Sequence, residues 1–477
     1  MTAARLIRAG MIVAFQHGEH RLLRDGCVVV EGDRIVHVGP HVEGSFENVL
    51  DMPDALLTPG LIDMHAHLTS ASYDRSYVED VGKPGFWFSG LPELLPAMSA
   101  AMDEEAQSAA VDYSMAELTR SGTTTVFEIG WLGDYTAGAV ERAGLRAYIG
   151  EGYGSARWHT QDGKRVRYAW KPDGGMEGLE AAIAFVKRIE GRAGGRIRGM
   201  LTPMQVAMAT PELLRRTRAA AQELNVPVTL HTAEAVFEFH EMVQREGMTP
   251  VQWLAAQDFL DERTILGHCV FTSGNSWVRH PGDDLSLLAD SGASVAHCPW
   301  VFARRGIAME SFAAYLEAGV TMCLGSDTAP QSILHAMRNA AIISKLQEHD
   351  CRRPTAIDVF NAATIAPARV LGRDDLGRIA PGAKADLLLW DTTGFSMVPC
   401  RDPIRNLVYY AGSEDLHHVM VDGEWLMTDK ALLKVDEASV RGNLAKAARR
   451  IWESIGPGDW AGRDIDQLSP HSLKEFQ

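Results

Sequence analysis

The sequence lacks the features that mark membrane-spanning, exported and dinucleotide-binding proteins. No apolar run reaches the length of about 18 residues that a bilayer-spanning helix needs, and the start of the chain has no apolar signal core. The six cysteines show neither a CxxC motif nor a paired spacing, which predicts reduced thiols in a cytoplasmic protein. No Gly-x-Gly-x-x-Gly motif follows an early strand, which argues against a dinucleotide site.

Basic residues are also in short supply. The chain has 46 lysines and arginines against 62 aspartates and glutamates, so its net charge is -16. A charge of this sign argues against nucleic acid and against anionic membrane surfaces as partners. The hydrophobic fraction of 46% and the charged fraction of 23% are typical of a soluble globular protein.

Short apolar strands alternate with longer helical patterns through the middle of the chain. This alternation predicts a parallel sheet flanked by helices, and eight such strands favour a closed (β/α)8 TIM barrel, which can reach 477 residues through insertions. The strands are expected at residues 56–67, 123–129, 145–153, 197–206, 226–234, 264–270, 294–300 and 320–327. Shorter strands joined by turns are expected at both ends of the chain, at residues 5–13, 26–31, 34–38, 377–391 and 418–426.

Histidines and one aspartate stand where several of these strands end. His65 and His67 are two residues apart on the first strand, so both imidazoles point to the same side. His231 ends the fifth strand and Asp327 ends the eighth. The carboxyl ends of barrel strands meet on one face, and three imidazoles with a carboxylate suit Zn²⁺ while leaving room for water. The pattern therefore predicts a metal site.

Two further side chains at these strand ends are candidates for catalysis. Glu234 lies three residues after His231, where a carboxyl group can pass a proton to a substrate. His268, at the end of the sixth strand, would hydrogen-bond a water or a developing oxyanion, or bind the metal directly. Each residue alone has an ordinary structural interpretation, such as a helix-capping carboxylate or a buried histidine. Their joint position at strand ends favours the catalytic one.

The motifs resemble those of the amidohydrolase superfamily, in its branch of aminohydrolases that act on heteroaromatic rings. This branch includes cytosine and guanine deaminases, S-adenosylhomocysteine deaminases and s-triazine hydrolases. The resemblance covers roughly residues 5–430. It rests on residues 59–67 (PGLIDMHAH), 231–234 (HTAE), 267–269 (GHC), 295–299 (VAHCP), 325–327 (GSD) and 376–387 (LGRIAPGAKADL).

The resemblance implies a metal-bearing barrel and a small β-sandwich built from both ends of the chain. The expected division is 1–55 and 371–430 for the β-sandwich, 56–370 for the barrel and 431–477 for a helical or irregular tail. Relatives with two metals carry a lysine or glutamate at the end of strand four, which this chain lacks, so one divalent ion is expected, Zn²⁺ first and Fe²⁺ as the alternative. The resemblance also suggests a homodimer or larger homo-oligomer.

The same resemblance implies hydrolytic deamination of a small N-heteroaromatic substrate. Asp327 would take a proton from the activated water, Glu234 would protonate the ring nitrogen, and His268 would steady the tetrahedral centre. The aromatic residues Phe86 and Trp87 stand where relatives place rings against a planar substrate, and Glu128 could hydrogen-bond an amino or ring N–H group. His297 and Trp300 complete the candidate substrate contacts.

Several alternatives stay open at this point. An amide or carbamate hydrolase, or a dehalogenase, could use the same metal site, and a catalytically dead scaffold is a remote alternative. Residues 157–171 form an excursion after the third strand, either a substrate wall or lid or a subunit contact. Residues 300–305 and 328–331 depart from the sequences of relatives, which predicts recognition of a different chemical group there. Cys269, Cys298 and Cys323 are expected to be inert core residues.

Overall fold

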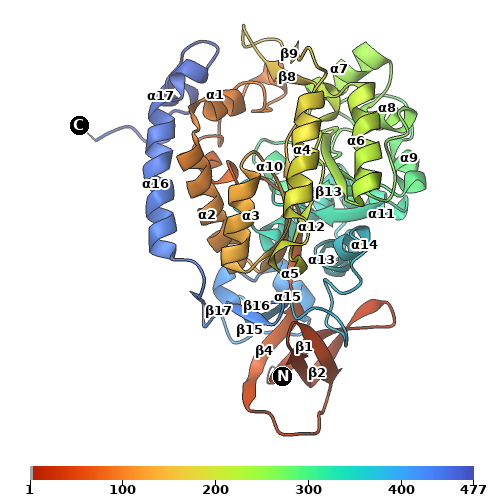
Figure 1. Ribbon diagram of the computed structural model, residues 1–477, viewed down its shortest axis with the longest axis vertical. Coiled ribbons are helices and arrows are strands. Elements are labelled where there is room, and N and C mark those ends of the chain that lie inside the picture. Colours follow the sequence, from red (N-terminus) through yellow and green to blue (C-terminus); the bar gives the residue numbers. More distant parts are fainter. Residues whose placement is uncertain (1–3, 477) are drawn as a thin grey trace.

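The computed structural model describes residues 4–476 and is a mixed α/β protein (Figure 1). One of its sheets joins the two ends of the chain. Its eight strands run in the order β18-β17-β16-β15-β4-β1-β2-β3, so that strand β4 pairs with β1 on one side and with β15 on the other. These strands are β1 (Arg5–Gln16), β2 (Glu19–Glu31), β3 (Arg34–Gly39), β4 (Asn48–Pro59), β15 (Leu387–Asp391), β16 (Leu416–Val421), β17 (Glu424–Thr428) and β18 (Ala431–Leu432).

Eight further strands are parallel and form two four-stranded sheets. Their orders are β10-β7-β6-β5 and β11-β12-β13-β14. Parallel bridges join the two sheets at both seams, Ala66 with Asp327 on one side and Leu201 with Val228 on the other. The strands are β5 (Leu61–Ala66), β6 (Thr123–Gly130), β7 (Arg146–Glu151), β10 (Ile197–Gly199), β11 (Val228–Thr232), β12 (Thr264–His268), β13 (Ser294–His297) and β14 (Thr321–Leu324).

The strand expected at residues 56–67 is in fact two strands that belong to different sheets. Strand β4 ends at Pro59 in the terminal sheet, and β5 begins at Leu61 beside β6. Gly60, between them, donates its backbone N–H to the carbonyl of Asp386 at 2.9 Å. A continuous apolar run hides this change of partner, because both strands are buried. The other expected strands of the middle are present, most of them shorter than predicted.

Apolar side chains fill the space between these parallel strands and outside them. One buried cluster draws on β5, β6, β7, β12, β13 and β14, with Phe127 stacked on Tyr148 at 4.6 Å between ring centroids. A larger cluster lies between the strands and the helices. The two clusters explain why these strands are apolar on both faces, as parallel strands covered by helices are.

Helices follow most of the parallel strands. Two of the caps expected from sequence are present: Asp103 accepts a hydrogen bond from Ala106 N, and Thr210 accepts one from Leu213 N. The α-helices up to β14 are α1 (Leu94–Ala101), α2 (Glu104–Arg120), α3 (Gly133–Ala143), α4 (Met176–Ile189), α5 (Arg192–Gly195), α6 (Pro211–Leu224), α7 (Val236–Glu246), α8 (Pro250–Ala256), α9 (Asp284–Ser291), α10 (Pro299–Ala303) and α11 (Phe312–Glu317). Those after β14 are α12 (Ile333–Glu348), α13 (Ala356–Ala362), α14 (Ile365–Val370), α15 (Pro403–Tyr409), α16 (Glu437–Glu453) and α17 (Ile465–Leu468). Short 3-10 helices are η1 (Ala71–Asp74), η2 (Pro84–Phe86), η3 (Val206–Met208), η4 (Ser413–Asp415) and η5 (Gly456–Gly458).

Two segments outside this repeat matter for the site. The excursion at residues 157–171 is an antiparallel hairpin of β8 (Ala156–His159) and β9 (Arg167–Trp170). It lies at the upper end of the molecule in Figure 1, opposite β1, β2 and β4 at the lower end. Helix α16 lies beside α2 and buries an apolar stripe in a cluster with it (Figure 1). Within residues 4–476, no helix combines the length and apolarity needed to cross a membrane.

Candidate functional site

Two of the predicted metal ligands face each other across the ends of β5 and β11. His67 Nε2 lies 3.1 Å from His231 Nε2. The Nδ1 atoms of both rings lie against backbone carbonyl oxygens, at 2.7 Å from Ile129 for His67 and at 2.6 Å from Met204 for His231. Each Nδ1 therefore carries the proton and donates it, which leaves an Nε2 lone pair on each ring. Two lone pairs at this distance repel unless a cation lies between them, which is the arrangement of metal ligands.

His65 and Asp327 close this group from the other side. Asp327 Oδ1 lies 3.3 Å from His67 Nε2 and 3.7 Å from His65 Nε2. The His65 side chain is fully buried, and neither ring nitrogen has a hydrogen-bond partner within the described part of the chain. A buried polar atom without a partner is costly, so a bound cation is the simplest explanation. The four predicted ligands fit a divalent metal.

The catalytic candidates Glu234 and His268 lie next to the metal ligands. Glu234 Oε1 is 3.8 Å from His268 Nε2, and its Oε2 accepts a hydrogen bond from Gln205 Nε2 at 3.4 Å. Burial, followed by the nearby carboxylates of Glu238 and Asp327, raises the pKa of Glu234 well above its usual range. A carboxyl group with a raised pKa keeps its proton to higher pH, which suits a proton donor. Sequence reasoning missed Gln205, because a lone buried glutamine carries no motif.

Glu238 fixes the backbone that presents Glu234. It occupies the third position of α7, and its carboxylate accepts N–H bonds from Ala233 at 3.0 Å, from Glu234 at 2.8 Å and from Ala235 at 3.3 Å. Ala233 has a left-handed φ of 52°, a strained conformation that persists only where the surroundings hold it. Burial raises the pKa of Glu238 to about 7. The pattern of glutamate at the third helical position could have revealed this role.

We predict that Glu238→Gln lowers kcat about tenfold without loss of bound metal. Glutamine puts an NH2 donor against backbone N–H donors, which loosens the turn that carries Glu234. The measurement is kcat with metal content determined on the same sample. Glu241→Gln is the matched control, because Glu241 lies on the same helix and pairs with Arg245. An unchanged kcat in Glu238→Gln would contradict the positioning role.

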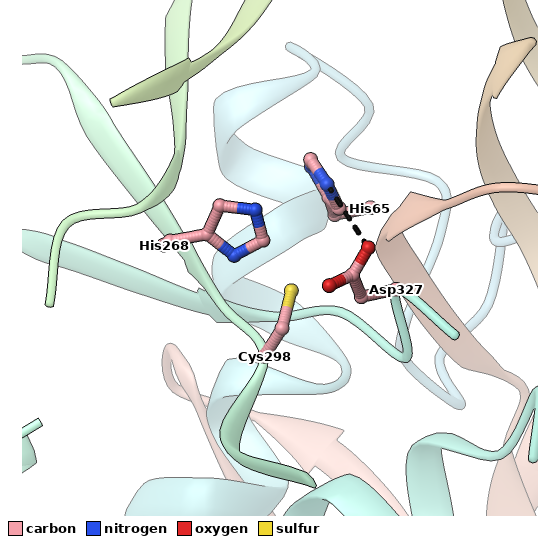
Figure 2. Close-up of side chains that lie close together, drawn as sticks. All are labelled: His65, His268, Cys298 and Asp327. Atoms are coloured by element: carbon pink, nitrogen blue, oxygen red, sulfur yellow. Dashed lines mark ion pairs between the residues drawn. The ribbon is translucent and has the colours of Figure 1, made fainter. Parts of the chain in front are cut away.

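A cysteine that the sequence assigned to the core lies beside the metal ligands. Figure 2 shows Cys298 facing His65, His268 and Asp327, and one donor atom from each of these residues lies within 4.8 Å of the others. Burial raises the pKa of the Cys298 thiol well above its usual range. Cys298 is therefore a neutral thiol in this structure. Its place directly after His297 at a strand end was the only available signal.

Two local features keep the site compact. Asp63 accepts hydrogen bonds from the backbone N–H groups of His65 and Ser326, both at 3.1 Å, and so ties β5 to the segment that presents Asp327. A β-carbon on Gly267 would lie 2.8 Å from His65 Cε1, so glycine gives this ring its space. His268 and Asp327 themselves have left-handed φ values of 76° and 60°. Such strain is typical of functional sites.

A cavity of about 600 Å³ opens next to these residues. His67, His231, Glu234 and Asp327 contribute to its wall, together with Gln205. Three indole rings from different segments, those of Trp87, Trp131 and Trp158, also line it. A space of this size with aromatic walls and a few polar groups suits a flat small molecule.

The predicted substrate contacts are divided by this cavity. Trp87 lines it and is 37% exposed. The other four predicted contacts are not among the described residues that line the cavity: Phe86, Glu128, His297 and Trp300. Glu128 accepts the backbone N–H of Leu68 at 2.6 Å, and Trp300 donates its indole N–H to the Ala329 carbonyl at 3.0 Å. In the structure these two side chains support the loops of the site.

The hairpin β8–β9 contributes to the same wall. Arg157, Trp158 and Lys171 all line the cavity. Trp158 packs edge-on against Phe237 of α7 at 6.2 Å between ring centroids, so the hairpin rests on the helix that Glu238 caps. The structure therefore makes the hairpin part of the cavity wall.

Comparison with known proteins agrees with this geometry. Residues 56–426 match the model of the amidohydrolase family. A 5-methylthioadenosine/S-adenosylhomocysteine deaminase of Halobacterium salinarum is 31% identical over 438 residues, covering 91% of this chain and 95% of that relative. A 5'-deoxyadenosine deaminase of Methanothermobacter thermautotrophicus is 30% identical over 434 residues, with coverage of 89% and 94%.

Solved structures give the same picture. An adenosine deaminase from Xanthomonas campestris with bound zinc has a TM-score of 0.80 and 25% identity, covering 94% of this chain and 98% of that one. An atrazine chlorohydrolase from Arthrobacter aurescens has a TM-score of 0.79 at 23% identity, covering 93% and 99%. At that identity the second likeness concerns the fold.

Proposed function

Because this chain belongs to the amidohydrolase family, we propose that it is a metal-dependent aminohydrolase that removes an amino group from an N-heteroaromatic ring. The observation that carries the proposal is the buried carboxyl of Glu234 beside the four predicted metal ligands and an aromatic-walled cavity. Adenine derivatives are the first ring class to test, since the relatives from Halobacterium and Methanothermobacter are named as deaminases of such compounds.

We infer that the ring of parallel strands is a (β/α)8 barrel and that the terminal sheet belongs to the family's small β-sandwich. The parallel bridges at both seams and the family match support this architecture. The division into residues 1–55, 56–370, 371–430 and 431–477 remains part of the proposal, as do a location in the cytoplasm and a homo-oligomeric state.

We propose one divalent ion, with zinc as the first choice because the Xanthomonas relative contains it. His65, His67, His231 and Asp327 would hold it. When bound, the ion supplies the Lewis acidity that makes water a nucleophile near neutral pH. Burial opposes ionisation of Asp327, yet its contacts with the surrounding imidazoles, first of all that of His67, hold its pKa well below the usual range. Asp327 is therefore an anion that can receive a proton.

The protein's own groups then divide the proton transfers. Glu234 donates to the ring nitrogen next to the reacting carbon, which makes that carbon more electrophilic. His268, at 3.8 Å from Glu234, lies where it can hydrogen-bond the oxygen that adds to the ring. Because the amino group leaves as ammonia, the proton that Asp327 receives must finally reach that nitrogen.

The proposal is tested by ammonia release from a panel of aminopurines, aminopyrimidines, pterins and amino-triazines. We expect the zinc-loaded protein to release ammonia from at least one ring class. Removal of the metal by a chelator should abolish this activity, and added Zn²⁺ should restore it. Release of halide or of a carboxylic acid product from other compounds, with no ammonia from the panel at full metal occupancy, would overturn the deaminase assignment in favour of a dehalogenase or an amide hydrolase.

A further inference from the structure

The cavity wall is rich in positive charge, although the chain as a whole is acidic. Its basic residues come from the hairpin β8–β9 and from the segment after β13: Arg157, Lys171, Arg304 and Arg305. The acidic residues in the same wall are Asp74, Glu234 and Asp327. Glu234 and Asp327 face the imidazoles of the predicted metal site, at His268 and His67. In a chain with net charge -16, such a concentration of cations favours an anionic ligand in the cavity.

Arg304 is not available to bind an anionic ligand, because carboxylates of the protein already pair with it. Its guanidinium is bound to Glu79 at 2.7 Å and to Asp74 at 3.4 Å. A third bond, at 3.1 Å, reaches the Thr328 hydroxyl directly after Asp327. With only 5% of its side chain exposed, Arg304 is a structural cation whose charge is already compensated.

The next residue, Arg305, makes no direct ion pair in the part of the chain that the structure describes, and the carboxylates of Asp74 and Glu79 act on it only from a greater distance. Its guanidinium donates one hydrogen bond, to the Phe88 carbonyl at 3.1 Å, and within residues 4–476 no carboxylate lies in ion-pair distance of it. Burial, followed by repulsion from the Arg304 cation, lowers the pKa of Arg305. An arginine that is partly buried beside another cation is unfavourable without an anion, so its remaining donors are available to a ligand.

The loop at residues 88–90 holds this guanidinium in place. Phe88 supplies the carbonyl acceptor. Gly90 lies close to the group, since a β-carbon there would be 2.6 Å from Arg305 Nη2 and 3.0 Å from Cζ. The position of the guanidinium is therefore fixed before a ligand arrives, which reduces the entropy lost on binding.

We propose that Arg305 binds a carboxylate carried by a substituent of the heteroaromatic substrate. This inference rests on the proposed function, because the ring must lie at Glu234 for its substituent to extend along the cavity. A planar guanidinium pairs with a carboxylate through two parallel N–H bonds, and within residues 4–476 no carboxylate of the protein makes such a pair with Arg305.

The test compares two ligands that share a ring and differ in their substituent. The sulfur of S-adenosylhomocysteine bears a 3-amino-3-carboxypropyl group, which carries a carboxylate and an ammonium, whereas the sulfur of 5'-methylthioadenosine bears only a methyl group. Calorimetry on zinc-loaded Glu234→Gln measures binding without turnover. We expect S-adenosylhomocysteine to bind about 10 to 100 times more tightly, the range for a hydrogen-bonded charge pair. Equal affinities, or no binding of S-adenosylhomocysteine, would contradict the carboxylate site.

Substitutions then assign the preference to Arg305. In the same background, Arg305→Gln should remove most of the difference between the two ligands, and Arg305→Lys should retain part of it because the charge remains while the planar fork is lost. Arg352→Gln is the matched control, as this arginine is exposed and pairs only with Asp350. A preference that survives Arg305→Gln would place the anion site elsewhere, for example at Arg157 or Lys171.

Gly90→Ala provides an independent variant that leaves every charge unchanged. The added methyl group would displace the guanidinium, so the preference for S-adenosylhomocysteine should fall as it does in Arg305→Gln. Ammonia release by the wild-type protein distinguishes failure of the proposed aminohydrolase activity from failure of the carboxylate site. Release from 5'-methylthioadenosine without a binding preference for the carboxylate ligand would leave the aminohydrolase intact and refute the carboxylate site. A binding preference without ammonia release from any ring would leave the carboxylate site intact and refute the aminohydrolase.

Discussion

Glu234→Gln is expected to lower kcat by about 10² to 10⁴, the usual effect of losing a general acid. Glutamine keeps the size and the contact with Gln205 Nε2, which lies 3.4 Å from the carboxyl group, but it cannot transfer a proton to the ring nitrogen. Glu234 is not among the four predicted ligands, so the metal content should stay at the wild-type level. The measurement is the steady-state rate of ammonia release from the best substrate of the panel, with metal determined on the same sample.

The comparison with Asp327→Asn separates proton transfer from metal binding. Asp327 lies within 3.3 Å of His67 and within 3.7 Å of His65, so its replacement should reduce both kcat and bound metal. Glu234→Gln should reduce kcat alone. A Glu234→Gln enzyme that turned over at the wild-type rate with full metal would exclude protonation by this residue. An Asp327→Asn enzyme with unchanged turnover would refute the assignment of the base.

The sequence sufficed to bring the four predicted metal ligands together because their spacing is a property of strands. Two histidines at positions i and i+2 share a side, and the ends of parallel strands share a face, so His65, His67, His231 and Asp327 could be brought together before any coordinates existed. In the structure a parallel bridge pairs Ala66, between the two histidines, with Asp327 and so places these ligands side by side. Glu234 followed from the same argument, since it lies just beyond the end of β11.

The side chains that support the site could not be found in this way. Cys298 reaches the site because of the direction in which the chain leaves β13, and Gln205 because of the course of the segment after β10. The hydrophobic periodicity of the sequence does not encode either feature. Phe86 and Trp300 show the opposite failure. Both occur in segments that border the cavity, yet one is buried at 1% exposure and the other donates its indole N–H to a backbone carbonyl. Residue type identified the segment correctly but did not determine which way the side chain points.

The split of the expected first strand at Gly60 has a related cause. Strand β4 belongs to the terminal sheet and β5 to the parallel one, and both are apolar because both are covered. Only the pairing of β4 with β15 distinguishes them. In this pairing Leu57 lies opposite Leu389, about 330 residues later in the chain. Pairing between such distant segments depends on tertiary packing, and a single sequence without relatives does not record it. The same distance in sequence hides the ion pairs that connect the two sheets.

Arg146 is the centre of those ion pairs. It lies on β7 and is bound to Asp386 at 3.3 Å, with a second contact to Asp422 at 2.5 Å. The side chains of Arg146 and Asp386 are only 1% and 4% exposed. Asp422 also has Lys384 at 3.4 Å, whereas the side chain of Asp386 depends on Arg146 for its counter-charge. Burial raises the pKa of Asp386, and the charge of Arg146 opposes that shift.

Arg146→Met is therefore expected to lower the free energy of unfolding by about 3 to 5 kcal/mol, because it leaves a buried carboxylate without its partner. Urea denaturation followed by circular dichroism measures the loss. Arg188→Met is the matched control: Arg188 pairs with Asp134 at 2.8 Å, with 53% and 63% of the two side chains exposed, so the loss should be about 0 to 1 kcal/mol. Adding Asp386→Leu to Arg146→Met should recover part of the stability, since the isolated charge is removed. If the double variant is less stable than Arg146→Met alone, the cost does not come from the unpaired carboxylate, and the ion pairs do not account for the connection between the two sheets.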